Sequence, residues 1–155
     1  TGSMLMIAEF DPVHPERLIS EPKCLSRPLY GFENTEHTIN NEGPYAFYYH
    51  NKIYLAYSGG DARGYLYAIG MLTANDGDDL CDLSVWEKAK TPIASFATIP
   101  GEYGPGHNSF FWDRDQNLWI AYHAVTSFEE KIVSSGMRRV YFEQDKTPRF
   151  DVIVE

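Results

Sequence analysis

The chain is poor in basic residues and in long apolar runs, and each shortage excludes a class of function. Lys and Arg number 13 against 22 Asp and Glu, which leaves a formal charge of -9. Phosphate binding needs a basic face, so we expect no nucleic-acid partner. No run of about twenty apolar residues occurs, so we expect no membrane-spanning segment. Met4–Ala8 is apolar but short, and it lacks the basic flank of a signal peptide.

Cysteine is scarce as well. Cys24 and Cys81 are the only two, and no metal-ligand spacing joins them. Two interpretations stay open, a disulfide or two unpaired thiols, and we favour the thiols.

Aromatic residues, in contrast, make up 15% of the chain, with 11 Tyr. Such side chains suit β-strands, and they also suit surfaces that face sugars. The composition therefore favours a strand-rich protein over a helical one.

One pattern occurs twice, roughly sixty residues apart. Phe47 and Phe110 occupy equivalent positions, and each is followed by a hairpin turn and an apolar stretch, Leu55–Tyr57 in the first copy and Ile120–Tyr122 in the second. Four short strands fit within such a period, as in the blades of a β-propeller. The copies differ at one position of interest, where Glu42 leads into the first hairpin and His107 into the second.

Strands and turns account for nearly all of the chain, so the predicted fold class is all β. Residues 29–41 are predicted to form a long connection, Asn51 and Lys52 to centre a hairpin turn, and Asp82–Trp86 to hold a turn of helix. We expect strands or short extended pieces at Met4–Phe10, Leu18–Ser20, Lys23–Ser26, Ala46–His50, Ile53–Ser58, Tyr65–Thr73, Glu87–Ser95, Phe110–Asp113, Leu118–Ala124, Arg138–Glu143 and Arg149–Val154.

Grouped by the repeat, these strands form about two and a half propeller blades of four antiparallel strands. Residues 1–41 hold the end of one blade and a connection, 42–95 a full blade, and 96–155 a last blade. Propellers need four or more blades to close. We therefore expect the missing blades to come from a partner segment, or the open sheet face to drive self-association. A small β-sandwich is the alternative, but it does not explain the repeat.

Several strings of residues resemble glycoside hydrolase family 43. They are Asn41–Pro44, Tyr57–Gly60, Gly70–Ala74, Tyr103–Phe110 and Tyr122–Ala124, together with Ile7–Glu9 and Leu25–Pro28, which are similar to its arabinofuranosidase-like members. The resemblance implies a five-bladed propeller that hydrolyses arabinose- or xylose-containing polysaccharides with inversion at the anomeric carbon. It implies no required cofactor, allows a calcium ion in the channel, and favours an extracellular or periplasmic location.

By the same resemblance, Glu42 is the general acid. An inverting glycosidase needs one acid and one carboxylate base, roughly 6.5 to 9.5 Å apart. The family places its base, and a further Asp that orients the acid, upstream of the acid, but no string before Glu42 resembles either. We therefore expect the chain to carry the acid half of a site and to be inactive alone. Without the resemblance, Glu42 is a solvated residue in a turn.

The resemblance also implies a set of sugar-facing residues. His107 is expected near the sugar, where it would approach an ion through water; its alternative is a histidine bonded within a tight Gly-Pro-Gly turn. Ser58, Asp61 and Arg63 form a loop that borders the pocket, with a plain turn as the alternative. Tyr122 is assigned to the sugar site as well.

Two further assignments complete the expectations. His123 is predicted to be a structural hydrogen-bond partner, and Arg138 or Arg139 to supply an arginine near the sugar. A hypothesis of another class stays open beside the hydrolase: a carbohydrate-binding or assembly module that does not cleave its ligand.

Overall fold

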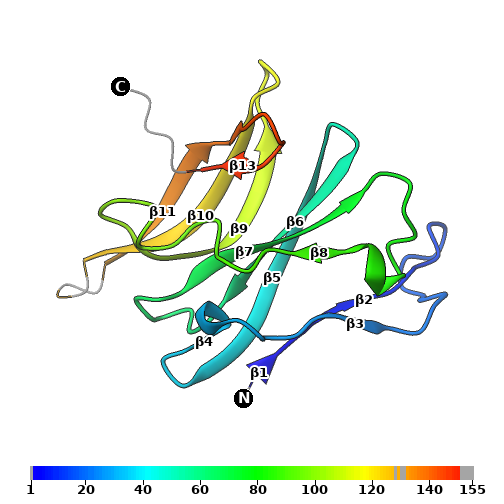
Figure 1. The fold of residues 1–155 in the computed structure, drawn as a ribbon, viewed down its shortest axis with the longest axis horizontal. Helices are drawn as coiled ribbons and strands as arrows, with labels where there is room; N and C mark the ends of the chain where they lie inside the picture. The colour runs from blue at the N-terminus through cyan, green and yellow to red at the C-terminus, as the bar shows by residue number, and fades with distance from the viewer. Residues whose placement is uncertain (1, 128, 130–131, 151–155) are drawn as a thin grey trace.

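The computed structural model describes residues 2–127, 129 and 132–150, and its extended elements are β-strands throughout (Figure 1). The strands are β1 (Gly2–Ser3), β2 (Leu5–Ile7), β3 (Lys23–Ser26), β4 (Asn34–Thr35), β5 (Thr38–Tyr49), β6 (Lys52–Gly59), β7 (Ala68–Asn75), β8 (Glu87–Lys88), β9 (Tyr103–Trp112), β10 (Leu118–Ser127), β11 (Ile132–Arg139), β12 (Tyr141–Phe142) and β13 (Pro148–Arg149). Two 3-10 turns, η1 (Gly31–Glu33) and η2 (Leu83–Val85), are the helical elements of these ranges. The all-β class is confirmed. No helix in the described ranges has the length and apolar character to cross a membrane.

Two sheets carry most of the strands. The first has the order β1-β5-β6-β7-β8, with β4 also paired to β5, and the second has the order β11-β10-β9. β9 packs beside β5, β6 and β7, so the two sheets stand next to one another as the cyan-to-green and yellow-to-orange groups of Figure 1. Apart from the parallel pairing of β1 with β5, the strands of both sheets run antiparallel. Adjacent sheets of this kind are the building units of a propeller, in agreement with the partial propeller predicted from the repeat.

The main core lies between these two sheets, and the repeat positions meet there. The rings of Phe47 and Phe110 are 4.5 Å apart between centroids, and Tyr54 stacks on Phe47 at 4.9 Å. Along β10, Leu118 and Ile120 are buried, in the alternating pattern of a strand with one face in the core. The sequence repeat is therefore also a packing repeat, because each copy supplies one aromatic ring to the shared interface.

The β5–β6 hairpin is present, but its turn lies one residue earlier than predicted. Tyr49 pairs with Lys52, which leaves His50 and Asn51 as a two-residue loop. Both have positive φ, 46° for His50 and 63° for Asn51. This is the type I′ geometry that matches the twist of the flanking strands, and Asn tolerates it well.

The N-terminal third departs most from expectation. The strand predicted at Met4–Phe10 is shortened to β2 and an isolated bridge at Phe10, and β1 lies before the predicted range. The piece predicted at Leu18–Ser20 contributes only the other half of that bridge, at Leu18. Lys23–Ser26 is confirmed as β3. The long connection predicted at 29–41 is wrong, because it contains η1, β4 and the first residues of β5. Three polar residues of this range, Glu33, Asn40 and Asn41, are buried inside the fold.

The third and fourth strands are shifted or shortened. β7 begins at Ala68 rather than Tyr65, and the expected outer strand Glu87–Ser95 consists of β8 and a single bridge at Ala94. Pro92 lies between these two pieces and lacks the N–H that a continuous ladder needs. The helical turn predicted at Asp82–Trp86 is confirmed as η2, with the Asp82 side chain accepting a hydrogen bond from Ser84 N.

At the C-terminal end, the structure contains a strand, β11, that the sequence pattern does not predict. It pairs along the length of β10, whereas the strand expected at Arg138–Glu143 covers only the end of β11 and β12. Its Ser-Ser-Gly centre has little apolar signal, as suits an edge strand. Of Arg149–Val154, the first residue belongs to β13, and positions 151–154 lie outside the described residues. Cys24 and Cys81 are unpaired, so the thiol interpretation holds.

Candidate active site

Glu42 lies on β5 at a break in the strand pairing. Its Cα pairs with Ser58, but the next regular pair joins Tyr45 to Ala56, so the residues between form a bulge. Gly43 has a φ of +57°, a conformation that glycine adopts without strain. Glu42 is thus the last regularly paired residue before the bulge, and it is half-buried.

Tyr67, which the sequence analysis does not identify as a site residue, contacts the Glu42 carboxyl group. Tyr67 is fully buried, and its hydroxyl donates a 2.7 Å hydrogen bond to Glu42 Oε1. Burial raises the pKa of Tyr67 above its usual range; a hydrogen bond with Ser58 opposes this rise, and the bond to Glu42 adds to it. The phenol is therefore neutral and available as a donor at ordinary pH. Among 11 Tyr, no spacing or neighbour marks this one in the sequence.

His107 reaches the same place from β9 of the other sheet. Its φ is 52°, unusual for a residue with a side chain, and its backbone N donates a 2.7 Å hydrogen bond to Ser58 Oγ. Its Nδ1 lies 3.4 Å from the Tyr67 hydroxyl. A Cβ on Gly43 would stand 3.4 Å from the imidazole ring, so the bulge that carries Glu42 packs directly against His107. The structure thus brings together the two positions at which the repeat copies differ.

His123 closes one side of this group from β10. Its ring lies nearly parallel to that of Tyr67, at 5.6 Å and 9°, and 6.4 Å from that of His107. Burial and the neighbouring His107 lower the pKa of His123, which favours its neutral form. The predicted structural role agrees with this half-buried, stacked position.

The loop of Ser58, Asp61 and Arg63 divides into two parts. Ser58 is fully buried and contacts both His107 and Tyr67. Asp61 accepts hydrogen bonds from the Arg63 backbone N at 2.9 Å and from Thr38 Oγ1 at 3.3 Å, which is the pattern of a turn. Arg63 is exposed. Sugar contacts by these three residues stay a prediction.

Tyr122 is not brought to Glu42. It precedes His123 on β10, so its side chain points to the opposite face of the strand. Its hydroxyl donates to Glu102 Oε2 at 2.6 Å and accepts from Arg138 Nε at 2.7 Å, while Arg138 also pairs with Glu102 at 2.7 Å. Tyr122 and Arg138 thus share a polar cluster of their own, and their assignment to a sugar site stays a prediction.

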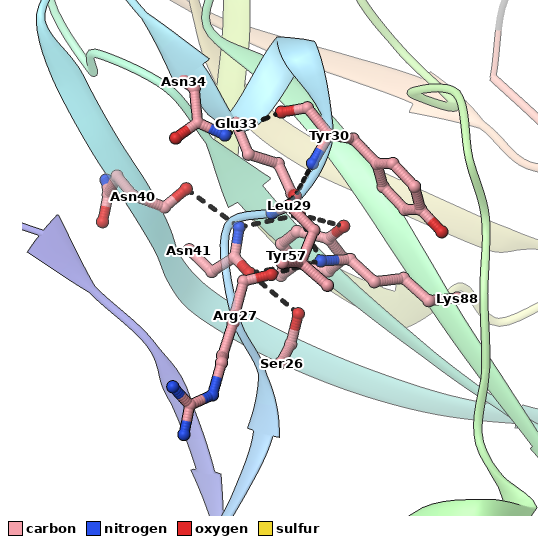
Figure 2. A network of polar contacts seen from close by, with 10 residues as sticks. All are labelled: Ser26, Arg27, Leu29, Tyr30, Glu33, Asn34, Asn40, Asn41, Tyr57 and Lys88. Carbon is pink, nitrogen blue, oxygen red and sulfur yellow. Dashed lines mark hydrogen bonds and ion pairs between the residues drawn. The ribbon is translucent and has the colours of Figure 1, made fainter.

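A second buried polar cluster lies against the first sheet and includes Asn41, the residue that precedes Glu42. Figure 2 shows the Glu33 carboxylate, wholly buried, surrounded by donors: the Lys88 ammonium at 2.5 Å, Tyr57 Oη at 2.7 Å and Asn41 Nδ2 at 2.8 Å. The backbone N–H groups of Leu29 and Tyr30 complete the set. Burial acts to raise the pKa of Glu33, but the Lys88 contact and these hydrogen bonds outweigh it and lower the pKa.

The geometry gives little support to a direct metal site at His107. In the described ranges, one group of three potential ligands lies close together, Glu9, Asp79 and Cys81, and His107 is not part of it. Calcium takes six to eight oxygen ligands, whereas the side chains contacting His107 offer two hydroxyls and no carboxylate. An ion held through water stays a prediction.

Comparison with known proteins places the chain in a family. An extracellular exo-alpha-(1->5)-L-arabinofuranosidase of Streptomyces avermitilis is 29% identical over an alignment of 161 positions that covers 99% of this chain and 33% of that protein. The enzyme of the same name from Streptomyces chartreusis is 38% identical over 64% of this chain and 30% of its own length. The chain thus spans about a third of the length of these curated relatives.

Solved structures of glycoside hydrolases are also similar to this chain. The crystal structure of alpha-L-arabinofuranosidase from Lactobacillus brevis superposes with a TM-score of 0.83 at 29% identity, covering 95% of this chain and 46% of that one. A thermostable family-43 glycoside hydrolase gives a TM-score of 0.77 at 26% identity, over 94% of this chain and 46% of that one. The model of the glycosyl hydrolases family 43 matches residues 3–148. The chain therefore belongs to glycosyl hydrolase family 43.

Proposed function

We propose that the chain supplies the general acid, Glu42, of an inverting hydrolase that acts on α-L-arabinofuranosides or related pentosides. The observation that carries the proposal is the meeting of Glu42 with His107 across two sheets, through Tyr67 and Ser58. The curated relatives are named as arabinofuranosidases, which supports the substrate class. The same names support an extracellular location.

The second carboxylate belongs to the same proposal. Inversion requires a base that activates water from the opposite side of the sugar, and no residue upstream of Glu42 resembles it. We propose that the base comes from the part of the family fold that this chain does not span. Carboxyl groups carry both proton transfers, so the reaction requires no cofactor.

The test compares Glu42→Gln with the unchanged protein, using the chain joined to the remaining blades. An amide of the same shape cannot donate the proton, so we expect kcat/KM on an arabinobioside to fall about 10²- to 10⁴-fold. The chain alone is expected not to hydrolyse nitrophenyl arabinofuranoside. Full activity of the Glu42→Gln variant would exclude Glu42 as the acid. Turnover by the chain alone would refute the proposal that the base lies outside this chain.

A second candidate is sugar binding without cleavage, and one surface favours it. A groove of about 410 Å³ between β5 and β9 is lined by Tyr45, Tyr48 and Trp112, which are 42%, 49% and 45% exposed. Exposed aromatic rings are suited to stacking on sugars. Calorimetric titration of the chain with arabino-oligosaccharides separates the two candidates, because the binding module predicts heat release without products.

A further inference from the structure

Among the polar contacts of the described residues, those of the Tyr67 side chain join Glu42, His107 and Ser58. Its hydroxyl is 2.7 Å from Glu42 Oε1 and 3.4 Å from His107 Nδ1, and it is hydrogen-bonded with Ser58. A phenol has a single proton to give, and the closest acceptor is the Glu42 oxygen. Ser58 and His107 therefore lie on the side of the hydroxyl's lone pairs, where Ser58 can donate its hydroxyl hydrogen and His107 Nδ1 stands 3.4 Å away.

The polar contacts accordingly run in one direction. Ser58 Oγ accepts from the His107 backbone N, which leaves its own hydroxyl hydrogen for Tyr67. Tyr67 in turn gives its hydrogen to Glu42. The network ends at one oxygen of the carboxyl group, Oε1, and in the described part of the chain no hydrogen bond reaches Oε2.

The second sheet holds the Tyr67 ring in place. A Cβ on Gly106 would stand 2.1 Å from Tyr67 Cε1, and one on Gly104 would stand 3.4 Å from Tyr67 Cβ. His123 stacks on the ring at 5.6 Å. With no exposed surface and neighbours at these distances, the ring has one orientation available. The glycines of the string Tyr103–Phe110 thus serve to admit the tyrosine beneath the acid.

We propose that Tyr67 is a positioning residue for the general acid: it fixes Glu42 through Oε1 and so reserves Oε2 as the oxygen that delivers the proton to the leaving group. This inference rests on the proposed function of Glu42. The proton passes from Oε2 to the glycosidic oxygen as the bond from that oxygen to the anomeric carbon breaks, and the carboxylate that remains keeps its hydrogen bond from Tyr67. A carboxyl group held in a single orientation needs no reorientation before the reaction, and such positioning is a recognised cause of rate acceleration.

The test uses the leaving group to separate acid catalysis from general damage. Tyr67→Phe and Glu42→Gln are assayed in the protein that joins this chain to the rest of the family fold, on an arabinobioside and on a dinitrophenyl arabinofuranoside. A dinitrophenolate departs without protonation, whereas a sugar alcohol does not. We expect Glu42→Gln to lose at least about 10²-fold in kcat on the arabinobioside. Tyr67→Phe should lose about 10-fold there and less than about 2-fold on the dinitrophenyl substrate, with KM unchanged.

Tyr57→Phe is the matched control. Tyr57 is equally buried and donates a 2.7 Å hydrogen bond to a carboxylate, but the carboxylate is that of Glu33. Any loss of kcat in Tyr57→Phe should be the same on both substrates, because this substitution affects only the stability of the fold.

The outcomes distinguish the two proposals. If Glu42→Gln loses equally on both substrates, Glu42 is not the acid and the proposed function fails. If Glu42→Gln loses more kcat on the arabinobioside than on the dinitrophenyl substrate, Glu42 keeps its assignment as the acid. If Tyr67→Phe then behaves like Tyr57→Phe, the positioning role of Tyr67 is overturned. Should the joined protein be inert on both substrates, urea unfolding of the chain bearing Tyr67→Phe, Glu42→Gln or both decides: the contact predicts a coupling of about tenfold in the unfolding equilibrium, and additive effects refute it.

Discussion

Replacing Lys88 by Met removes the cation from the buried Glu33 cluster while keeping an unbranched side chain of similar length. Glu33 has no exposed surface and Lys88 only 14%, so solvent screens this pair weakly. Removing one partner of a buried ion pair costs about 3 to 5 kcal/mol, because the other charge is left uncompensated. The four hydrogen bonds to Glu33 that remain favour the lower end of that range.

Contacts with aromatic rings add to the loss. The Lys88 ammonium lies 5.2 Å from the centroid of Tyr30 and 5.3 Å from that of Tyr57. Cation–π contacts are worth about 0.5 to 1 kcal/mol each where partly exposed. We therefore expect Lys88→Met to lower the free energy of unfolding by about 4 kcal/mol at pH 7, a large share of the roughly 5 to 15 kcal/mol typical of a domain.

The dependence on pH identifies the cause. The pKa of Glu33 is lowered in the folded chain from the usual 4.5, so the ion pair stabilises the fold above that value and ceases to do so as the pH falls through the lowered pKa. The deficit of Lys88→Met should therefore shrink in acid.

Urea unfolding followed by tryptophan fluorescence measures this deficit at several pH values. Lys90→Met, the same change at an exposed position two residues along, is the control and should stay within about 0.5 kcal/mol of the unchanged chain. A loss under about 1 kcal/mol at pH 7, or a deficit that does not depend on pH, would refute a charge-based role for Lys88.

Three further tests concern the packing and the turns. Gly106→Ala places a methyl group 2.1 Å from the Tyr67 ring and should cost about 1 to 3 kcal/mol by urea unfolding, whereas Gly31→Ala, which meets nothing within 4 Å, should be nearly neutral. Phe47→Ala and Phe110→Ala should each cost about 3 to 5 kcal/mol, with a coupling of about 0.5 to 1.5 kcal/mol in the double variant, since the rings touch; additive losses would contradict this. Asp113→Asn should lower the melting temperature at pH 7 but not near pH 2. Hydrogen bonds from Trp119 and Asn117 hold the pKa of Asp113 at about 2 rather than 3.8, so its stabilisation is present above 3.8 and is lost as the pH falls through 2; equal effects at both pH values would exclude this role.

Local patterns predicted the hairpins well, because alternation and turn residues lie within a few positions of one another. β3, the β5–β6 pair and η2 follow from such signals. β11 does not, since it is held by pairing with β10 and its Ser and Gly residues carry no apolar period.

The surroundings of Glu42 show the same limit at the level of the site. The resemblance pointed to Glu42 and His107, and in the structure both lie within hydrogen-bond reach of the Tyr67 hydroxyl. The sequence does not reveal the importance of Tyr67 and Glu33, because it depends on burial and on distant partners. Tyr67 contacts Glu42, 25 positions away, and Glu33 pairs with Lys88, 55 positions away. Tyr122 was grouped with the site because it belongs to a matching string, yet a strand turns alternate residues to opposite faces, and its neighbour His123 is the one that points toward Tyr67.

The hydrogen bond from His107 N to Ser58 Oγ ties the site to the joint between the two sheets. Glu42 lies on β5 and Tyr67 immediately precedes β7 of the same sheet, whereas His107 lies on β9 of the other sheet, so separating the sheets dismantles the group. A ligand that contacts both Glu42 and His107 binds only the docked arrangement, and mass action then shifts docking in its favour, by about 2.7 kcal/mol at a hundredfold excess over its Kd. Ligand affinity and the cohesion of neighbouring blades are consequently one linked equilibrium, and a substitution deep in the interface, such as at Phe47 or Phe110, should weaken sugar binding without touching the sugar.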